Sequence, residues 1–233
     1  MADETPLEGG RVTPGVVRVG DTVRRPLSAN SPFVHRLLEH LEEVGFEAAP
    51  RFVGIDEQGR GMLTFVDGDV PTSCEEIVWR DEQLDAAGRL LRRFHAATAL
   101  SPLRDTREVV CHGDFGPWNL VWRDDLPVAV IDFDNAAPGD ALDDLGYAAW
   151  KHLNLGLLDL PVSEQRRRLE ILVSSYGARA DGALLRSIAD AQDRMQGLIE
   201  GTADDGRHEA LRRLVRERDW LARNGSLLLD QSR

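Results

Sequence analysis

The feature of this chain that most constrains its fold is a pair of short apolar stretches that end in polar clusters. The first, Val109–Cys111, runs directly into His112-Gly113-Asp114. The second, residues 128–131, ends at Asp132, and Asn119 lies between the two clusters. Short apolar runs bounded by glycine, proline and aspartate are typical of buried strands. We therefore predict short strands whose neighbouring ends carry Asn119 and Asp132, beside a loop that carries Asp114.

These three side chains fit the chemistry of phosphoryl transfer from a nucleotide. Such transfer needs a divalent cation at the phosphates, ligands for that cation, and a carboxylate that holds the attacking hydroxyl. Mg²⁺ prefers oxygen ligands, which Asn119 and Asp132 supply. Asp114, five residues before Asn119, is placed to orient and deprotonate the hydroxyl. The spacing is that of the H-x-D-x-x-x-x-N catalytic loop of kinases.

The rest of the chain indicates an α+β fold. Alternating apolar residues around turns predict hairpins over 15–25 and 51–66, and apolar positions at helical spacing predict a helix over 32–44 between them. Beyond a loop at 67–71 the pattern becomes mostly helical, with amphipathic stretches near 84–94, 164–176, 183–200 and 205–222. We expect a small β-rich N-terminal lobe over 1–66 and a mostly helical C-terminal lobe over 67–233.

Composition excludes several classes of partner. The chain has 28 Lys and Arg against 40 Asp and Glu, a formal net charge of −12. Nucleic acids and anionic membranes are bound by concentrated basic charge, so neither is an expected partner. The acidity is compatible with a cationic ligand, although solubility is the simpler explanation. Cys74 and Cys111 are too few and too far apart for a disulfide framework or zinc site. With no visible signal peptide or membrane-length apolar run, we expect a cytoplasmic protein.

The polar clusters also carry a family resemblance. His112-Gly113-Asp114 with Pro117 and Asn119, followed by Ile131-Asp132-Phe133-Asp134, resembles the signature of the aminoglycoside phosphotransferases and choline kinases. Gly139-Asp140 and Asp143-Asp144-Leu145 resemble further elements of that family. The resemblance implies a protein-kinase-like two-lobed fold with a reduced N-terminal lobe. It also implies ATP or GTP as phosphoryl donor and Mg²⁺ as cofactor.

The resemblance assigns roles to individual residues. It places Arg24 at the nucleotide phosphates and the backbone of Thr64 and Val66 at the adenine. It makes Asp144 a buttress of the catalytic loop and His112 a packing and hydrogen-bonding residue rather than a general base. Leu7-Glu8-Gly9-Gly10 resembles the start of a shortened phosphate-covering hairpin. Where the family has an acidic partner for the phosphate-binding base, this chain has Val34, with His35 and Glu39 nearby.

Several alternatives stay open on the residues alone. Asp134 is either an additional metal ligand or a turn former, and Trp118 either lines the acceptor site or packs in the core. The expected function is a small-molecule kinase acting on a hydroxyl of a small, cationic acceptor such as an aminoglycoside, in a monomer or homodimer. The alternative is a kinase-fold binding or immunity protein without turnover, supported by the shortened N-terminal lobe and the missing acidic partner. The chain also resembles proteins named trifolitoxin immunity protein. A protein kinase is disfavoured because no A-P-E element follows Asp132.

Overall fold

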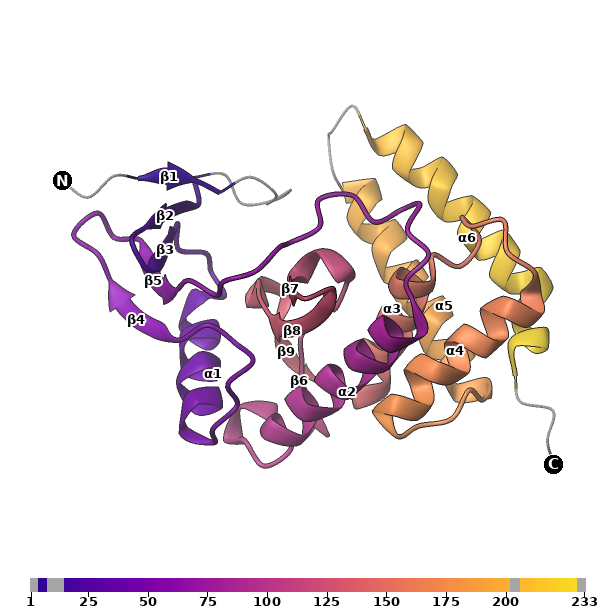
Figure 1. Ribbon diagram of the computed structural model, residues 1–233, viewed down its shortest axis with the longest axis horizontal. Helices are drawn as coiled ribbons and strands as arrows, with labels where there is room; N and C mark the ends of the chain where they lie inside the picture. The colour runs from indigo at the N-terminus through magenta and orange to yellow at the C-terminus, as the bar shows by residue number, and fades with distance from the viewer. Residues whose placement is uncertain (1–3, 8–14, 202–205, 230–233) are drawn as a thin grey trace.

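A five-stranded antiparallel sheet and one helix form the N-terminal part of the protein (Figure 1). The computed structural model describes residues 4–7, 15–201 and 206–229. The strand order in the sheet is β1-β2-β3-β5-β4, and the hairpins predicted over 15–25 and 51–66 are confirmed as β2–β3 and β4–β5. The bounds of these elements are β1 Thr5–Pro6, β2 Val17–Val19, β3 Thr22–Arg25, α1 Ser31–Glu43, β4 Phe52–Ile55 and β5 Gly61–Thr64. The expected phosphate-covering segment around Gly9 and Gly10 lies outside the described residues.

Helix α1 forms for reasons visible in its sequence. Asn30 is the N-cap, and Pro32 in the first turn has no N–H that would be left unpaired. Leu37, Leu38 and Leu41 recur on one face and are fully buried, each contributing about 2 kcal/mol of transfer free energy. Gly45 follows the helix with a φ of +72°, a left-handed conformation that glycine adopts without strain.

Two small antiparallel ladders occupy the centre of the protein. β6 (Val109–Cys111) pairs with β9 (Ala137–Gly139), and β7 (Leu120–Arg123) pairs with β8 (Leu126–Val130). The predicted strands at 109–111 and before Asp132 are confirmed. They belong to different ladders, since β6 finds its partner in β9, which the sequence did not predict. Single-turn 3₁₀ helices at Pro117–Asn119 and Phe133–Asn135 connect these strands.

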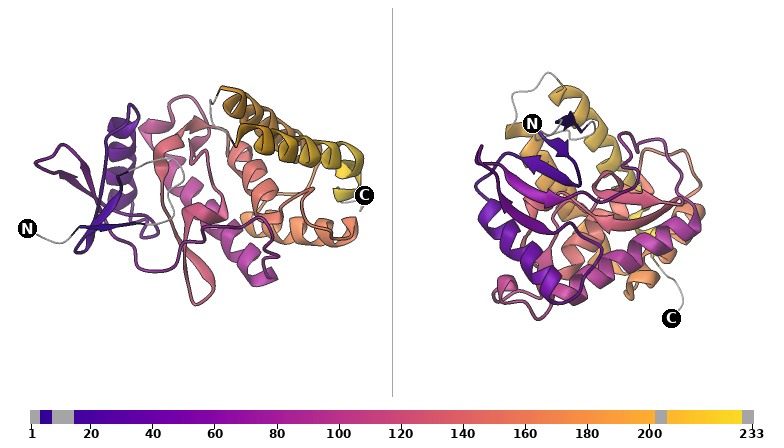
Figure 2. Two further views of the ribbon diagram at one scale, coloured as in Figure 1. Left: turned by 90° about the horizontal axis from the view of Figure 1, so that it is seen from above. Right: turned by 60° about the vertical axis from the view of Figure 1, so that its left-hand side comes forward.

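Five helices form the rest of the described chain and pack as a bundle beside the central ladders (Figure 2). α2 packs on α4 and β8, while α3 packs on α5 and α5 on α6. The helices predicted at 164–176, 183–200 and 205–222 are confirmed as α4, α5 and α6. Their bounds are α2 Asp81–Thr98, α3 Ala141–Leu153, α4 Val162–Tyr176, α5 Gly182–Gly201 and α6 Arg207–Leu228. Among the described residues, none of these helices has the length and apolarity needed to cross a bilayer.

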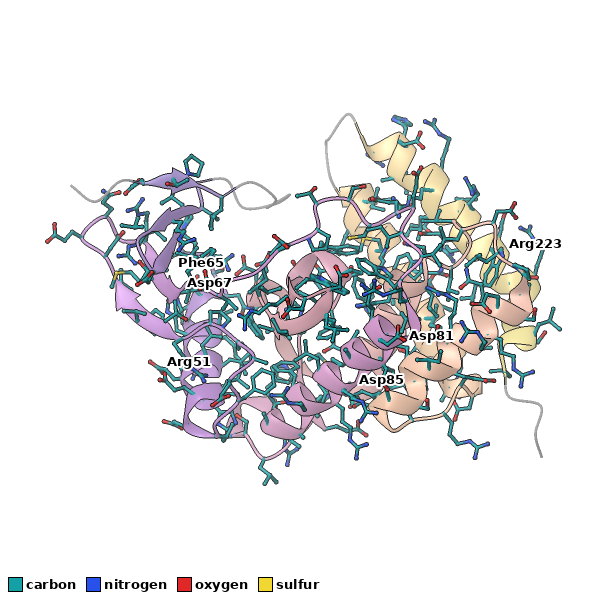
Figure 3. The ribbon with its side chains drawn as sticks, viewed as in Figure 1. Arg51, Phe65, Asp67, Asp81, Asp85 and Arg223 are labelled. Carbon is teal, nitrogen blue, oxygen red and sulfur yellow. The ribbon has the colours of Figure 1, made fainter. Side chains whose placement is uncertain are left out.

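The segment between β5 and α2 is fixed to the central ladders. The backbones of Asp69 and Trp122 exchange two hydrogen bonds of 2.8 Å. Gly68, at φ +140°, lies so close that a Cβ there would stand 2.5 Å from the Trp122 carbonyl oxygen. The ring of Trp79 stacks on that of Trp122 with centroids 4.5 Å apart. Figure 3 labels Phe65 and Asp67 where the chain leaves the sheet, and the predicted lobe boundary at residue 66 falls between them.

Asn30 and His40 connect helix α1 to the C-terminal part of the chain. The Asn30 side-chain amide donates to the carbonyl oxygens of Asp134 (2.8 Å) and Ala136 (3.1 Å). His40 donates through Nε2 to the carbonyl oxygen of Ala97 in α2 at 2.9 Å. Both ends of α1 are therefore attached to elements of the opposite lobe.

Candidate active site

Asp114 lies in the loop after β6, and its carboxylate is held by three side chains. The Tyr147 hydroxyl donates to Oδ1 at 2.5 Å. Asn119 Nδ2 donates to Oδ2 at 2.8 Å, and the indole N–H of Trp118 approaches the same oxygen at 3.4 Å. The carboxylate is half-buried and fixed in orientation, as a group that positions a reacting hydroxyl must be.

Asp144 fixes the loop itself from within the core. Its side chain accepts hydrogen bonds from the backbone N–H groups of His112 (2.5 Å) and Gly113 (2.8 Å). It also accepts from Nε2 of His95 at 3.0 Å. Burial raises the pKa of this carboxyl, but the His95 hydrogen bond and charge and the backbone donors outweigh burial, so the pKa is lowered overall. Asp144 therefore holds the backbone of the loop at residues 112–114 from its buried side.

His112 connects the catalytic loop to the segment that follows β8. The backbone N–H of Asp114 donates to its Nδ1 at 3.2 Å, so Nδ1 is an acceptor. Nε2 then carries the proton and donates to the Ile131 carbonyl oxygen at 3.0 Å. The ring is fully buried, and both nitrogens are used within the protein. This geometry is that of a structural histidine rather than a general base.

Asn119 and Asp132 come together at the paired ends of β7 and β8. The backbone N–H of Ile131 donates to the Asn119 carbonyl oxygen at 2.9 Å. Asn119 uses Nδ2 for the carbonyl and carboxylate oxygens of Asp114, which leaves its Oδ1 as a neutral oxygen ligand. Asp132 has φ 62° and ψ 67°, a left-handed conformation that is uncommon outside glycine and often found at functional sites. These oxygens fit the ligand preference of Mg²⁺.

Arg25, rather than Arg24, faces these acids. The guanidinium of Arg25 lies 3.3 Å from Asp132 Oδ1 and forms a closer ion pair with Asp134 Oδ2. Its neighbour Arg24 lies on the other face of β3, with Nε 3.7 Å from Asp56 Oδ2 in the β4–β5 turn. Successive strand residues point to opposite faces of a sheet, so only one of the two arginines can reach the acids. Asp134 therefore forms an ion pair with Arg25 of the small lobe.

Thr64 and Val66 lie where the chain leaves the sheet. The Thr64 hydroxyl accepts from the backbone N–H of Arg51 at 2.8 Å, so this side chain holds β4 and β5 together. Neither the N–H nor the C=O of Val66 pairs with a described residue. This open backbone is what recognition of a purine edge would require.

Sequence reasoning missed two residues of the site. Tyr147 follows the Asp143-Asp144-Leu145 element by two residues, and the family resemblance assigns it no role. Its signal was its position three residues after Asp144, which places both side chains on one helix face. Arg25 is the second missed residue, because the resemblance pointed to Arg24 and the sequence of a strand does not by itself show which of two adjacent arginines faces inward.

A two-lobed fold in which Asp114, Asn119 and Asp132 lie at the ends of central strands is that of a kinase-like phosphotransferase. Residues 97–180 match the Phosphotransferase enzyme family. A relative from Rhizobium leguminosarum bv. trifolii, the Trifolitoxin immunity protein, is 36% identical, with 76% of this chain and 75% of the relative covered. The chain belongs to the phosphotransferase enzyme family.

Solved structures support the fold. Choline kinase from Cryptosporidium parvum Iowa II superposes with a TM-score of 0.65 at 10% identity, covering 97% of this chain and 91% of the other. The APH(2″)-IIa protein, solved in a ternary complex with streptomycin and ATP, superposes with a TM-score of 0.57 at 12% identity, covering 92% and 91%. At these identities the likeness establishes the kinase-like fold and leaves the acceptor open.

Proposed function

We propose that this protein is a small-molecule kinase that transfers the γ-phosphate of ATP or GTP to a hydroxyl group of a small acceptor. The observation that carries the proposal is the carboxylate of Asp114, which is fixed in orientation and accepts a hydrogen bond from Asn119. Asn119 precedes β7, and Asp132 follows β8, the strand that pairs with β7. Asp114 would orient the hydroxyl and accept its proton. Its three side-chain donors keep it aimed while the acceptor binds.

Asn119 and Asp132 would hold Mg²⁺, whose chemistry when bound is to neutralise charge on the nucleotide phosphates. The two residues would not be interchangeable as metal ligands, because only Asp132 carries a negative charge. Arg25 would turn from Asp132 and Asp134 to the phosphates, for which its planar fork of donors is suited. Val66 would offer its unpaired backbone groups to the base.

The acidic side chains that could attract a cationic acceptor each have an arginine partner in this structure. Asp134 contacts Arg25, Asp140 accepts from Arg107 at 2.8 Å, and Asp143 lies 3.8 Å from Arg194. Acids with arginine partners offer less to a polycation than free ones. An aminoglycoside is therefore one candidate acceptor among hydroxyl compounds.

A second candidate is a binding or immunity protein on the same fold without turnover. It is favoured by the name of the Rhizobium relative. The contact between Arg25 and Asp132 favours it too, because it engages the acid that a metal would need. Both candidates are expected in a monomer or homodimer that binds neither nucleic acid nor membrane.

Nucleotide binding separates the two candidates. ATP and GTP are titrated by calorimetry with and without Mg²⁺ into the wild type, Asp132→Ala, and Asp85→Ala as a control acid on the exposed side of α2. The kinase proposal expects Mg²⁺-dependent binding by the wild type and the control that is lost in Asp132→Ala. Absence of nucleotide binding at millimolar concentration would sink it and leave the binding protein as the better candidate.

A further inference from the structure

One basic residue differs in kind from all the others in this chain. Lys151 is the only lysine among 28 Lys and Arg residues, and every other one is an arginine. An arginine side chain is permanently charged and wide, whereas lysine carries a compact, titratable ammonium. A chain that otherwise uses arginine throughout has its single ammonium next to the proposed active site.

The position of Lys151 follows from the helix it occupies. It lies four residues after Tyr147 in α3, so the two side chains share one helix face. The Tyr147 hydroxyl donates to Asp114, and the Lys151 ammonium lies 5.9 Å from the centroid of the Tyr147 ring. The ammonium also lies 3.4 Å from the centroid of the Trp150 ring, a cation–π contact.

The charged groups that face Lys151 are Asp114, Glu75, Arg213 and Glu217. Arg213 of α6 engages both nearby glutamates, at 3.1 Å from Glu75 and 3.6 Å from Glu217. Burial raises the pKa of Glu217, although the charges of Lys151 and Arg213 act to lower it. Lys151 makes no hydrogen bond or ion pair with any described residue.

The ammonium has acidic neighbours, but none of them contacts it directly. Lys151 is half-buried, and burial lowers its pKa to about 8 although Glu217 and Asp114 act to raise it. It stays mostly protonated at neutral pH. The face of the Trp150 ring lies where an ion pair would have a carboxylate. Removing a cation from water without a partner is unfavourable, and a bound anion would relieve that cost.

We propose that Lys151 binds an anionic group of the acceptor, a carboxylate or a phosphate carried by the molecule whose hydroxyl Asp114 orients. The inference rests on the proposed kinase function and names the acceptor class that this function would use. A polycationic acceptor would instead bring an ammonium against Lys151. The acceptor class is therefore hydroxy acids or hydroxylated phosphate compounds.

The single lysine makes a direct test possible. Reductive methylation with ¹³C-formaldehyde keeps the charge and gives one dimethyl-lysine NMR signal, from Lys151, beside that of the N-terminal amine. The probes are 4-hydroxybutyrate, glycerol 3-phosphate, 4-amino-1-butanol and 1,4-butanediol, each added with Mg²⁺ and a non-hydrolysable ATP analogue. We expect 4-hydroxybutyrate or glycerol 3-phosphate to shift the signal and raise its titration midpoint, and which of them does so identifies the anion. A shift by the amino alcohol instead, or by none of the four at the highest usable concentration, overturns the inference.

Kinetics give a second test, with Lys151→Gln, Lys151→Arg and the control Arg212→Gln, which removes an exposed charge of α6. For an anionic acceptor we expect KM to rise about tenfold to a hundredfold in Lys151→Gln, the loss of one charge-assisted hydrogen bond. Lys151→Arg should recover most of it, and Arg212→Gln should leave KM unchanged. A fall in kcat with no change in acceptor KM would contradict an acceptor-binding role. Mg²⁺–ATP binding is measured in the same samples: its absence refutes the kinase, whereas nucleotide binding without any anion effect refutes only this inference.

Discussion

Arg25 in β3 contacts Asp132, 107 residues further along the chain, with 3.3 Å between its guanidinium and the carboxylate. The contact joins the small lobe directly to the acid expected to hold Mg²⁺. It also replaces the acidic partner missing at Val34, because the arginine finds its carboxylates on the opposite lobe instead of on α1. If the nucleotide phosphates and Mg²⁺ bound together, Arg25 would contact the phosphates and Asp132 would contact the metal. The ion pair between Arg25 and Asp132 would then separate.

Replacing Arg25 should weaken nucleotide binding selectively. We expect Arg25→Gln to lower the affinity for Mg²⁺–ATP at least about tenfold, the cost of one charge-assisted contact. Arg24→Gln is the matched control, since it removes the same group from the other face of β3 and should change the affinity by less than about threefold. Isothermal titration of both variants checks this, and equal losses in the two would contradict the assignment of Arg25.

Replacing Asp114 should remove turnover and leave nucleotide binding intact. Asp114→Asn keeps the size of the side chain but no longer accepts a proton, so kcat should fall by about 10² to 10⁴. ADP release with an active acceptor measures turnover, and calorimetry measures nucleotide binding. Comparable loss of binding and kcat would show that Asp114 supports the nucleotide site rather than the hydroxyl.

Asp144 should stabilise the protein in a pH-dependent way. Its pKa is lowered in the folded protein from the ordinary value of 3.8, so it binds protons more weakly folded than unfolded. Its contribution is therefore complete above about pH 5 and is lost as the pH falls through the unfolded and then the lowered folded pKa. Asp144→Asn should lower the free energy of unfolding in urea by about 2–4 kcal/mol at pH 7. The two carboxylate oxygens accept from three donors, whereas an amide has only one oxygen that can accept.

This difference between wild type and Asp144→Asn should shrink when the measurement is repeated below pH 4. Asp85→Asn, which removes an exposed ion pair with Arg89, should cost less than about 1 kcal/mol at either pH. Figure 3 labels Asp85 on α2. A constant difference between wild type and Asp144→Asn across the pH range would exclude an ionised, buried Asp144 as the support of the loop.

Gly113 should tolerate no side chain. It has a φ of +79°, and a Cβ there would stand 2.4 Å from the Asn135 carbonyl oxygen. Gly113→Ala should therefore cost about 3 kcal/mol, from left-handed strain together with displacement of backbone. Gly20→Ala is the control, since Gly20 has a φ of +59° with open space around it and should cost only about 1 kcal/mol. Urea unfolding of both variants measures the difference.

The sequence predicted which residues lie at the ends of the central strands, but not every strand pairing or the direction of every strand side chain. Asp114, Asn119 and Asp132 could be placed because turn residues and apolar runs fix them to strand ends within a few residues. β9 could not, because three residues containing Pro138 carry no alternation and pair only once β6 is present. Arg25 could not be chosen over Arg24, because the inward face of β3 depends on its register with β5.

The attachments of α1 have a consequence for how the chain can change. By sequence the helix belongs with the sheet, but Asn30 and His40 fix it to the opposite lobe. Helix α1 also packs on the sheet, because the His35 ring stacks on the Phe52 ring of β4 with centroids 3.8 Å apart, so the helix joins both lobes. A chain divided at residue 66 would remove α1 from the larger fragment, together with the contacts of Asn30 and His40. We therefore expect neither fragment to reproduce the structure of the whole protein.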